Sequence, residues 1–173
     1  LIRLAVPLQI GVQLLPTLFR DFKNLYPEIE LEVVEAGGID SLRMIENEEL
    51  DLAVTNYDDS FSPNLHYRKL FKSEACFCTY PDHPLAQKKY VDTKDIANEP
   101  LVLLNGGFFV NRLIYQNFQQ ALTAPKVILH SSQLHTVKNL ISSQIASSFL
   151  MRQAITASDN IIPLSVSYTH LRA

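Results

Sequence analysis

The sequence has no tryptophan, and it contains only two cysteines, two methionines and five glycines among 173 residues. It also has no apolar run that approaches the roughly 18 to 20 residues of a membrane-spanning helix. The amino-terminal residues lack the basic flank and the long apolar stretch of a signal peptide. From the sequence alone we therefore expect a soluble protein that carries no targeting segment and makes no contact with a membrane.

Positive charge is in the minority, with 15 Lys and Arg residues against 18 Asp and Glu residues and a net charge of −3. A surface that binds nucleic-acid backbones needs clustered cations that release counterions. We therefore do not expect this segment to bind DNA by itself. The hydrophobic fraction of 47% and the charged fraction of 19% are those of an ordinary globular domain, which excludes disordered and coiled-coil classes.

The two cysteines, Cys76 and Cys78, lie two residues apart in an apolar run. On a strand they would point to the same face, in a poor position to form a disulfide with each other. No histidine or further cysteine completes a set of metal ligands around them. The spacing favours reduced core residues over a redox or metal role, and it suits a reducing compartment. We expect no metal site.

The first third of the chain alternates between the hydrophobic periods of strands and helices. The predicted elements are a strand, a helix, a strand, a helix and a strand, at residues 1–6, 15–26, 29–33, 39–45 and 50–55. Pro16 either opens or kinks the first helix, and Pro27 ends it, because proline lacks the N–H of a helical hydrogen bond. Asp40 is the candidate N-cap of the second helix. This alternation predicts a parallel sheet with right-handed crossovers.

The alternation is then interrupted and later returns. Residues 65–80 predict an extended connection, and residues 81–100 predict a polar loop with at most one helical turn near Asp95. The remaining segments predict strand, helix, strand, helix, strand, short helix and strand, at residues 101–104, 108–122, 127–130, 134–142, 145–150, up to 157, and 161–164. Two α/β lobes joined by an extended segment are the simplest account of this order.

All five glycines fall where a predicted strand is followed by a predicted helix, at Gly11, Gly37, Gly38, Gly106 and Gly107. Ligands of open parallel sheets bind beyond the carboxyl ends of the strands, where glycine lets backbone N–H groups approach a ligand. The alternative explanation is ordinary turn chemistry, since glycine shortens such connections. No Gly-x-Gly-x-x-Gly or Gly-Lys-Ser/Thr motif is present, so we expect no nucleotide cofactor.

Catalytic patterns are also scarce. The five histidines are scattered, none has the spacing of a helical metal pair, and the acidic clusters are typical of solvated helix ends and loops. The polar residues at the predicted strand ends are neutral: Gln9, Asn56, Asn105, Ser131, Ser132 and Gln133. Such groups orient a small polar ligand and do not transform it. We therefore expect a binding protein with no catalytic residues.

Several segments, in their order and spacing, resemble the effector-binding region of LysR-type transcriptional regulators. They are the run 2–6 followed by Leu14-Leu15-Pro16, Phe22 with Tyr26-Pro27, Leu50-Asp51-Leu52-Ala53-Val54, His83-Pro84-Leu85-Ala86, and a run from Ser131 through Val137 and Leu140-Ile141 to Ile155. The resemblance covers nearly the whole chain. It implies the two-lobed type 2 periplasmic-binding-protein fold, in which each lobe is a mainly parallel sheet flanked by helices and crossing strands join the lobes.

The same resemblance implies the domain boundaries and the end of the chain. Residues 1–73 would begin lobe I, residues 74–162 would form lobe II, and residues 163–173 would be a truncated return to lobe I whose final strand and helix are missing. The family usually has glycines and a proline around residues 144–151, and this chain has none there. We hypothesise that residues 165–173 end in a foreign tail, because the last eight residues look like translated sequencing-adapter read-through.

Functionally, the resemblance implies a cytoplasmic sensor that binds a small metabolite in the cleft between its lobes. A separate amino-terminal winged helix-turn-helix, absent from this sequence, would contact DNA. The family commonly forms homodimers or tetramers, and the implied faces of an antiparallel dimer are residues 16–25 and 108–122. A periplasmic-type solute-binding protein for a small polar ligand is the alternative function.

The effector-binding residues that the resemblance implies come from both lobes. They are Leu8, Gln9, Ile10, Gly37, Asn56, Asn105, Gly106, Gly107, Phe108, Ser131 and Ser132. Helix starts favour anions, so a small carboxylate is the expected effector. No Arg or Lys is among these residues, which leaves a neutral ligand as the alternative.

Overall fold

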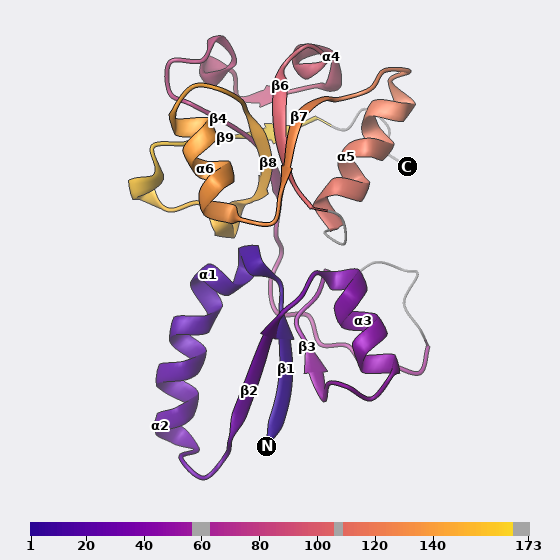
Figure 1. Cartoon of the computed structure of the whole chain (residues 1–173), viewed down its shortest axis with the longest axis vertical. Helices are drawn as coiled ribbons and strands as arrows, with labels where there is room; N and C mark the ends of the chain where they lie inside the picture. Colours follow the sequence, from indigo (N-terminus) through magenta and orange to yellow (C-terminus); the bar gives the residue numbers. More distant parts are fainter. Residues whose placement is uncertain (57–62, 106–108, 168–173) are drawn as a thin grey trace. The chain divides into compact units, whose positions relative to one another are not determined.

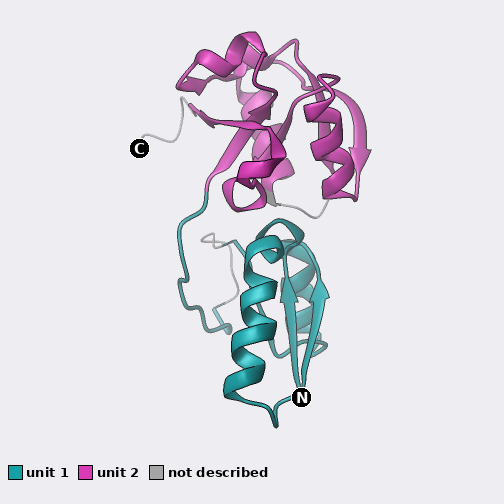
Figure 2. Cartoon of the chain, turned by 90° about the vertical axis from the view of Figure 1, so that its left-hand side faces the viewer, with its two compact units in different colours: residues 1–73 teal, residues 74–173 magenta. Residues whose placement is uncertain are grey.

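The computed structural model describes residues 1–56, 63–105 and 109–167. The chain divides into two compact units, residues 1–73 and 74–173 (Figure 2). Both units are built from strands and helices that alternate along the chain (Figure 1). Among the described residues, no helix has the length and apolar character needed to cross a membrane.

Unit 1 contains a three-stranded parallel sheet in the order β2-β1-β3. The strands are β1 (Ile2–Val6), β2 (Leu31–Glu35) and β3 (Leu52–Ala53). The two crossovers contain α1 (Leu8–Thr17) and α3 (Gly38–Glu46), which lie on opposite sides of the sheet (Figure 1). The predicted β-α-β-α-β unit with parallel strands is therefore confirmed.

The first helix starts earlier than its apolar stripe predicts. It begins at Leu8, passes through Pro16, and continues as a π-helical turn (Leu18–Phe22) and α2 (Lys23–Leu25). Pro16 therefore does not open the helix. Because proline cannot donate a helical hydrogen bond, the backbone after Pro16 changes its hydrogen-bond spacing, and π-helical turns are one such irregularity. The helix ends before Pro27, as predicted.

Unit 2 contains two groups of strands, one in the order β5-β9-β4-β8 and one that pairs β6 with β7. Strand β4 runs antiparallel to β8 and β9, whereas β5 is parallel to β9 and β6 is parallel to β7. The strands are β4 (Ala75–Thr79), β5 (Tyr90–Val91), β6 (Pro100–Leu104), β7 (Lys126–Ser131), β8 (Ser148–Met151) and β9 (Ile162–Val166). The helices are α4 (Thr93–Ile96), α5 (Phe109–Gln120) and α6 (Leu134–Ser142).

Ser147 joins the two groups of strands. A parallel bridge pairs it with Leu101, the Ser147 N–H donates to Pro100 O at 3.0 Å, and the Val102 N–H donates to Ser147 O at 2.9 Å. The buried Ser147 hydroxyl also donates to Thr79 Oγ1 at 2.9 Å. Strands β5, β9, β8, β6 and β7 therefore all run in the same direction, and β4 runs against them.

Two apolar clusters form the core of unit 2. One contains Phe77, Phe118 and Phe149. The other contains Cys76 and Cys78 with residues of β6 and α6. Both thiols are free and fully buried, as predicted for core cysteines. Burial raises the pKa of the Cys76 thiol to about 11 and raises that of Cys78 further, so neither cysteine is a reactive thiolate.

Three segments differ from the sequence expectations or refine them. Within residues 65–80 the only strand is β4. Within the polar segment 81–100 the structure adds the short β5 and a 3₁₀ turn at Pro84–Gln87. The helical turn predicted near Asp95 is α4, but the expectation of at most one helical turn in this segment was wrong. Strand β9 pairs with β4 and β5 in unit 2, and residues 168–173 lie outside the described residues. A truncated return to the first lobe and a foreign tail stay predictions.

The start of α3 depends on a glycine. A Cβ atom on Gly38 would lie 2.6 Å from Thr55 Oγ1, closer than such atoms approach. We expect Gly38→Ala to destabilise the protein by about 1–3 kcal/mol, the usual cost of overpacking. Urea unfolding should show this cost largely relieved in Thr55→Ala, which removes the hydroxyl. An equal cost in both backgrounds would mean that another contact selects glycine.

Candidate functional site

The polar groups of unit 1 gather at the edge where its three parallel strands end. There α1 begins at Leu8, with Pro7 as its N-cap residue and no side-chain cap. The side chains of Gln9 and Ile10 are buried, with 3% and 5% of their surface exposed, and Leu8 is half-buried. Leu8 is therefore the one of these three predicted effector-binding residues whose side chain has substantial exposed surface.

The second helix start at this edge belongs to α3. Its N-cap is Gly37, and not Asp40, which lies in the first helical turn and forms an ion pair with Arg43 at 3.0 Å. Gly37 has φ −65° and so does not use the left-handed conformations open to glycine. The buried Ser41 hydroxyl donates to Gly37 O at 2.8 Å and to Ala36 O at 3.2 Å, which holds the turn before α3.

The third strand end carries Thr55 and Asn56, which follow β3 and are both half-buried. The Val54 N–H donates to Ala5 O at 2.8 Å and continues the pairing of β3 with β1. A Cβ atom added to Gly38 would lie within 4 Å of the Thr55 side chain and of the Asn56 backbone nitrogen, so the start of α3 packs closely against the residues that follow β3. The predicted residues Gly37 and Asn56 are thus brought close together at one edge.

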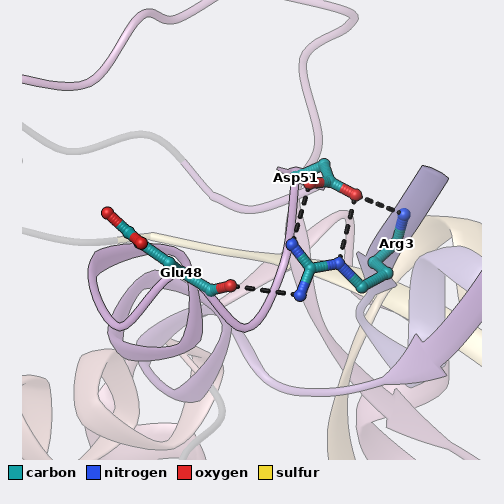
Figure 3. Close-up of polar contacts among 3 residues, drawn as sticks. All are labelled: Arg3, Glu48 and Asp51. Carbon is teal, nitrogen blue, oxygen red and sulfur yellow. Dashed lines mark hydrogen bonds and ion pairs between the residues drawn. The ribbon is translucent and has the colours of Figure 1, made fainter. Parts of the chain in front are cut away.

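Arg3 and Asp51 fix the beginning of β3 (Figure 3). The Arg3 N–H donates to Asp51 Oδ2 at 2.8 Å, its Nη2 donates to Oδ1 at 2.9 Å, and the Asp51 N–H donates to Arg3 O at 3.0 Å. Arg3 Nη1 also donates to Glu48 O at 3.1 Å. These hydrogen bonds to the side chain and backbone of Arg3 lower the pKa of Asp51 to about 2.

In unit 2, the predicted residues that the structure describes lie where β6 and β7 end. The Asn105 N–H donates to Ser131 O at 2.9 Å, so the ends of the two strands stay paired. Asn105 and Ser132 are exposed, and Ser131 is half-buried with its hydroxyl accepting from the Gln133 N–H at 3.1 Å. The predicted residues Gly106, Gly107 and Phe108 lie outside the described residues.

Asn111 supports this edge, although sequence analysis did not select it. It lies in the first turn of α5, its side chain is buried, and its Nδ2 donates to the carbonyl oxygen of Leu104, the last residue of β6. The bond holds the backbone directly before Asn105. An asparagine three residues into a predicted helix could have signalled this role, because Asn otherwise disfavours helix interiors.

Arg152 is the second residue that sequence analysis missed. It directly follows β8, and β8 lies next to β6 through the Ser147 bridge. Since these strands are parallel, Arg152 lies at the same edge as Asn105 and Ser131. Its guanidinium donates to Glu74 Oε2 from Nη2 at 2.9 Å and from Nε at 3.1 Å. The sequence signal was a cation two residues after the end of the predicted strand 145–150.

Glu74 completes the charged part of this edge. Hydrogen bonds from the Ser165 hydroxyl and the Arg152 guanidinium lower the pKa of the Glu74 carboxyl. Both side chains of the ion pair are partly exposed. Among the described residues, no group of three or more His, Cys, Asp or Glu side chains is arranged so that it could hold a metal ion. This edge therefore combines neutral hydrogen-bonding groups with the Arg152–Glu74 ion pair.

Comparison with known protein families matches residues 1–167 of the chain to the LysR substrate binding domain. The transcriptional dual regulator GltC of Bacillus subtilis (strain 168) is 28% identical over 148 residues, which cover 82% of this chain and 47% of GltC. The HTH-type transcriptional regulator MetR of Escherichia coli (strain K12) is 29% identical over 102 residues, covering 59% of this chain and 32% of MetR. The chain spans about half the length of GltC.

Solved structures show the same fold. The effector binding domain of QuiR in complex with shikimate has a TM-score of 0.78 and 21% identity, and the match covers 96% of this chain and 80% of that domain. The CcmR regulatory domain of Synechocystis PCC6803 in complex with 2-PG has a TM-score of 0.82 and 20% identity, with the same coverage. The predicted type 2 periplasmic-binding-protein fold is confirmed.

The low pKa of Asp51 predicts a pH dependence of stability. A carboxyl whose pKa falls from 3.8 to about 2 on folding stabilises the folded state above pH 4, and this stabilisation is lost as the pH falls from about 4 to 2. We expect Asp51→Asn to lower the Tm at pH 6 and to have a vanishing effect near pH 2. Thermal unfolding across this range measures the difference.

Arg3→Gln provides the control for this experiment. Without the guanidinium, the effect of Asp51→Asn on the Tm should vary less between pH 6 and pH 2, because only the backbone N–H of residue 3 still donates to Asp51 Oδ2. A pH dependence as strong as that in the parent background would show that the guanidinium does not lower the pKa of Asp51.

Proposed function

The chain belongs to the LysR substrate-binding domain family, and we propose that its two strand-end edges bind a small-molecule effector. The observation that carries this proposal is the position of the polar groups. In each unit they lie at the carboxyl ends of parallel strands: Asn56 follows β3 in unit 1, and in unit 2 Asn105 follows β6 and Ser131 is the last residue of β7. Ligands of open α/β sheets bind at such edges. The remaining predicted residues, including Leu8, Gln9, Ile10, Gly37 and Ser132, are part of the same proposal.

We propose that the effector is a small carboxylate. Two observations support this choice over a neutral ligand: the edge of unit 1 contains the starts of α1 and α3, and the edge of unit 2 contains Arg152. Helix starts and guanidinium groups both favour anions. The ligand in the QuiR structure, shikimate, is itself a carboxylate. No acid, base or nucleophile is proposed to act on the ligand, and the relatives are transcriptional regulators, not enzymes.

The proposal extends to the complete regulator. GltC and MetR are transcriptional regulators about two to three times as long as the segments matched here, as their coverage of 47% and 32% indicates. We propose that a separate winged helix-turn-helix segment contacts DNA in the cytoplasm and that effector binding changes this contact. The effector would do so by its different affinity for two conformations of the domain. The alternative, a periplasmic-type solute-binding protein, has less support because the matched relatives are regulators.

We also propose that the domain forms a homodimer or tetramer. Large apolar side chains are exposed on the helical segment 16–25 and on α5 and the residues after it: Phe19, Leu25, Tyr115 and Leu122, with exposures of 50%, 72%, 42% and 95%. Exposed apolar residues that cluster on helices are typical of interaction surfaces. They support residues 16–25 and 108–122 as the two faces of an antiparallel dimer.

Effector binding is tested by thermal shift with shikimate and a panel of small carboxylates, amino acids and sugars, because a ligand of the native state raises the Tm. For a carboxylate that binds, Arg152→Gln should weaken the affinity about 10-fold or more, the cost of a charged hydrogen bond. Asn105→Ala should also weaken it. The matched control, Asn139→Ala, changes an exposed asparagine on α6 and should have no effect. Stabilisation by sugars alone would reject a carboxylate effector, and no stabilisation by any class would reject effector binding.

The dimer is tested by sedimentation. We expect the parent protein to sediment as a dimer or tetramer, and Phe19→Lys with Leu25→Lys to shift it toward the monomer, because two charges would be buried in an apolar interface. Ile145→Lys changes a residue of similar exposure, 52%, outside the proposed faces and should leave the mass unchanged. A monomeric parent, or equal effects of both changes, would reject these faces.

A further inference from the structure

The boundary between the two units falls between Ser73 and Glu74. Glu74 directly precedes β4, and β4 lies between β8 and β9 with both neighbours antiparallel to it. In this register Ala75 pairs with Met151, so Glu74 lies beside Arg152, where β8 ends. The connection between the units therefore enters unit 2 at the edge where β8 and β9 end.

Glu74 is held there by its backbone and its side chain. The Arg152 N–H donates to Glu74 O at 2.9 Å, and the Arg152 guanidinium donates two hydrogen bonds to Glu74 Oε2. The Ser165 hydroxyl contributes a further hydrogen bond to the carboxylate. The two strands that flank β4 thus both contact the first residue of the unit.

The position of this ion pair matters more than its strength. Exposed ion pairs typically contribute less than about 1 kcal/mol to folding stability, and the two side chains are 48% and 43% exposed. Releasing Glu74 would nevertheless add rotational freedom at the residue where the connection meets a rigid sheet. A few residues at the end of an element are enough to set the range of a hinge.

We propose that the Glu74–Arg152 ion pair restrains the connection between the units and so limits the range of their relative positions. This role does not require a bound effector, although Arg152 is also part of the proposed effector site, and it places a hinge restraint on the same edge of unit 2 that carries Asn105. The hinge begins at Ser73, because Glu74 is fixed to unit 2. Loss of the Glu74 carboxylate removes the side-chain part of this restraint, while the hydrogen bond from the Arg152 N–H to the carbonyl oxygen of residue 74 remains.

The test measures the spread of distances between the units in protein without effector. Spin labels on cysteines introduced at Glu46 and Gln116, exposed residues of α3 and α5, report one inter-unit distance by double electron–electron resonance. Cys76 and Cys78 are fully buried and should not react with the label. Labelled protein diluted with unlabelled protein removes distances between subunits. We expect Glu74→Ala to broaden the distance distribution and Glu74→Gln to broaden it less.

The matched control is Lys88→Gln, which breaks an exposed ion pair with Asp95 inside unit 2, away from the connection. It should leave the distribution at its parental width. The proposal would be overturned if Glu74→Ala and Lys88→Gln both kept the parental width of the distance distribution. It would also be overturned if Lys88→Gln broadened the distribution as much as Glu74→Ala does. Because no effector is present, these outcomes are independent of whether any carboxylate binds.

Discussion

The hydrogen bonds of Ser147 decide where the polar groups of unit 2 lie. By pairing with the backbone of Pro100 and Val102, Ser147 attaches β6 and β7 to the other strands in a parallel direction. An antiparallel attachment would place Asn105 and Ser131 at the opposite edge from Arg152. A short side chain is suited to this position because its hydroxyl finds a buried partner in Thr79, which avoids the cost of an unpaired polar group in the core.

In unit 1 the strand ends are brought to one edge by the close packing of α3 against the end of β3. The strands of this unit are joined by short crossovers, and α3 lies close enough to the end of β3 that only glycine fits at Gly38. The ion pair of Arg3 with Asp51 fixes the other end of that short strand. With only two residues in β3, its place in the sheet depends on these contacts at both of its ends as well as on its ladder hydrogen bonds. Each unit thus uses a few short-range contacts to bring its strand ends to one edge.

The alternation of strands and helices was predictable because hydrophobic periodicity is a local property of the sequence. Helix limits were harder to predict. The apolar stripe begins at Leu15, whereas α1 starts at Leu8 and its buried residues are Gln9, Ile10 and Gly11. Asp40 resembles an N-cap, although the turn held by Ser41 places the cap at Gly37. The neutral residues of the edges followed from their positions after predicted strands. Arg152 and Asn111 did not, because their roles depend on which strands are neighbours, and strand order comes from long-range pairing that periodicity does not contain.

The order of the strands in unit 2 explains why Arg152 and Glu74 lie beside each other at the edge where β8 ends. Arg152 is paired with Glu74 and half exposed, so it needs no costly burial of an isolated charge. A guanidinium held in this way keeps a defined direction, so its side chain would lose less conformational entropy on binding a ligand than a free side chain would. The same carboxylate also fixes the residue at which the chain enters the unit. The two proposed roles, in ligand binding and at the connection between the units, therefore depend on one exposed ion pair whose contribution to folding stability is small.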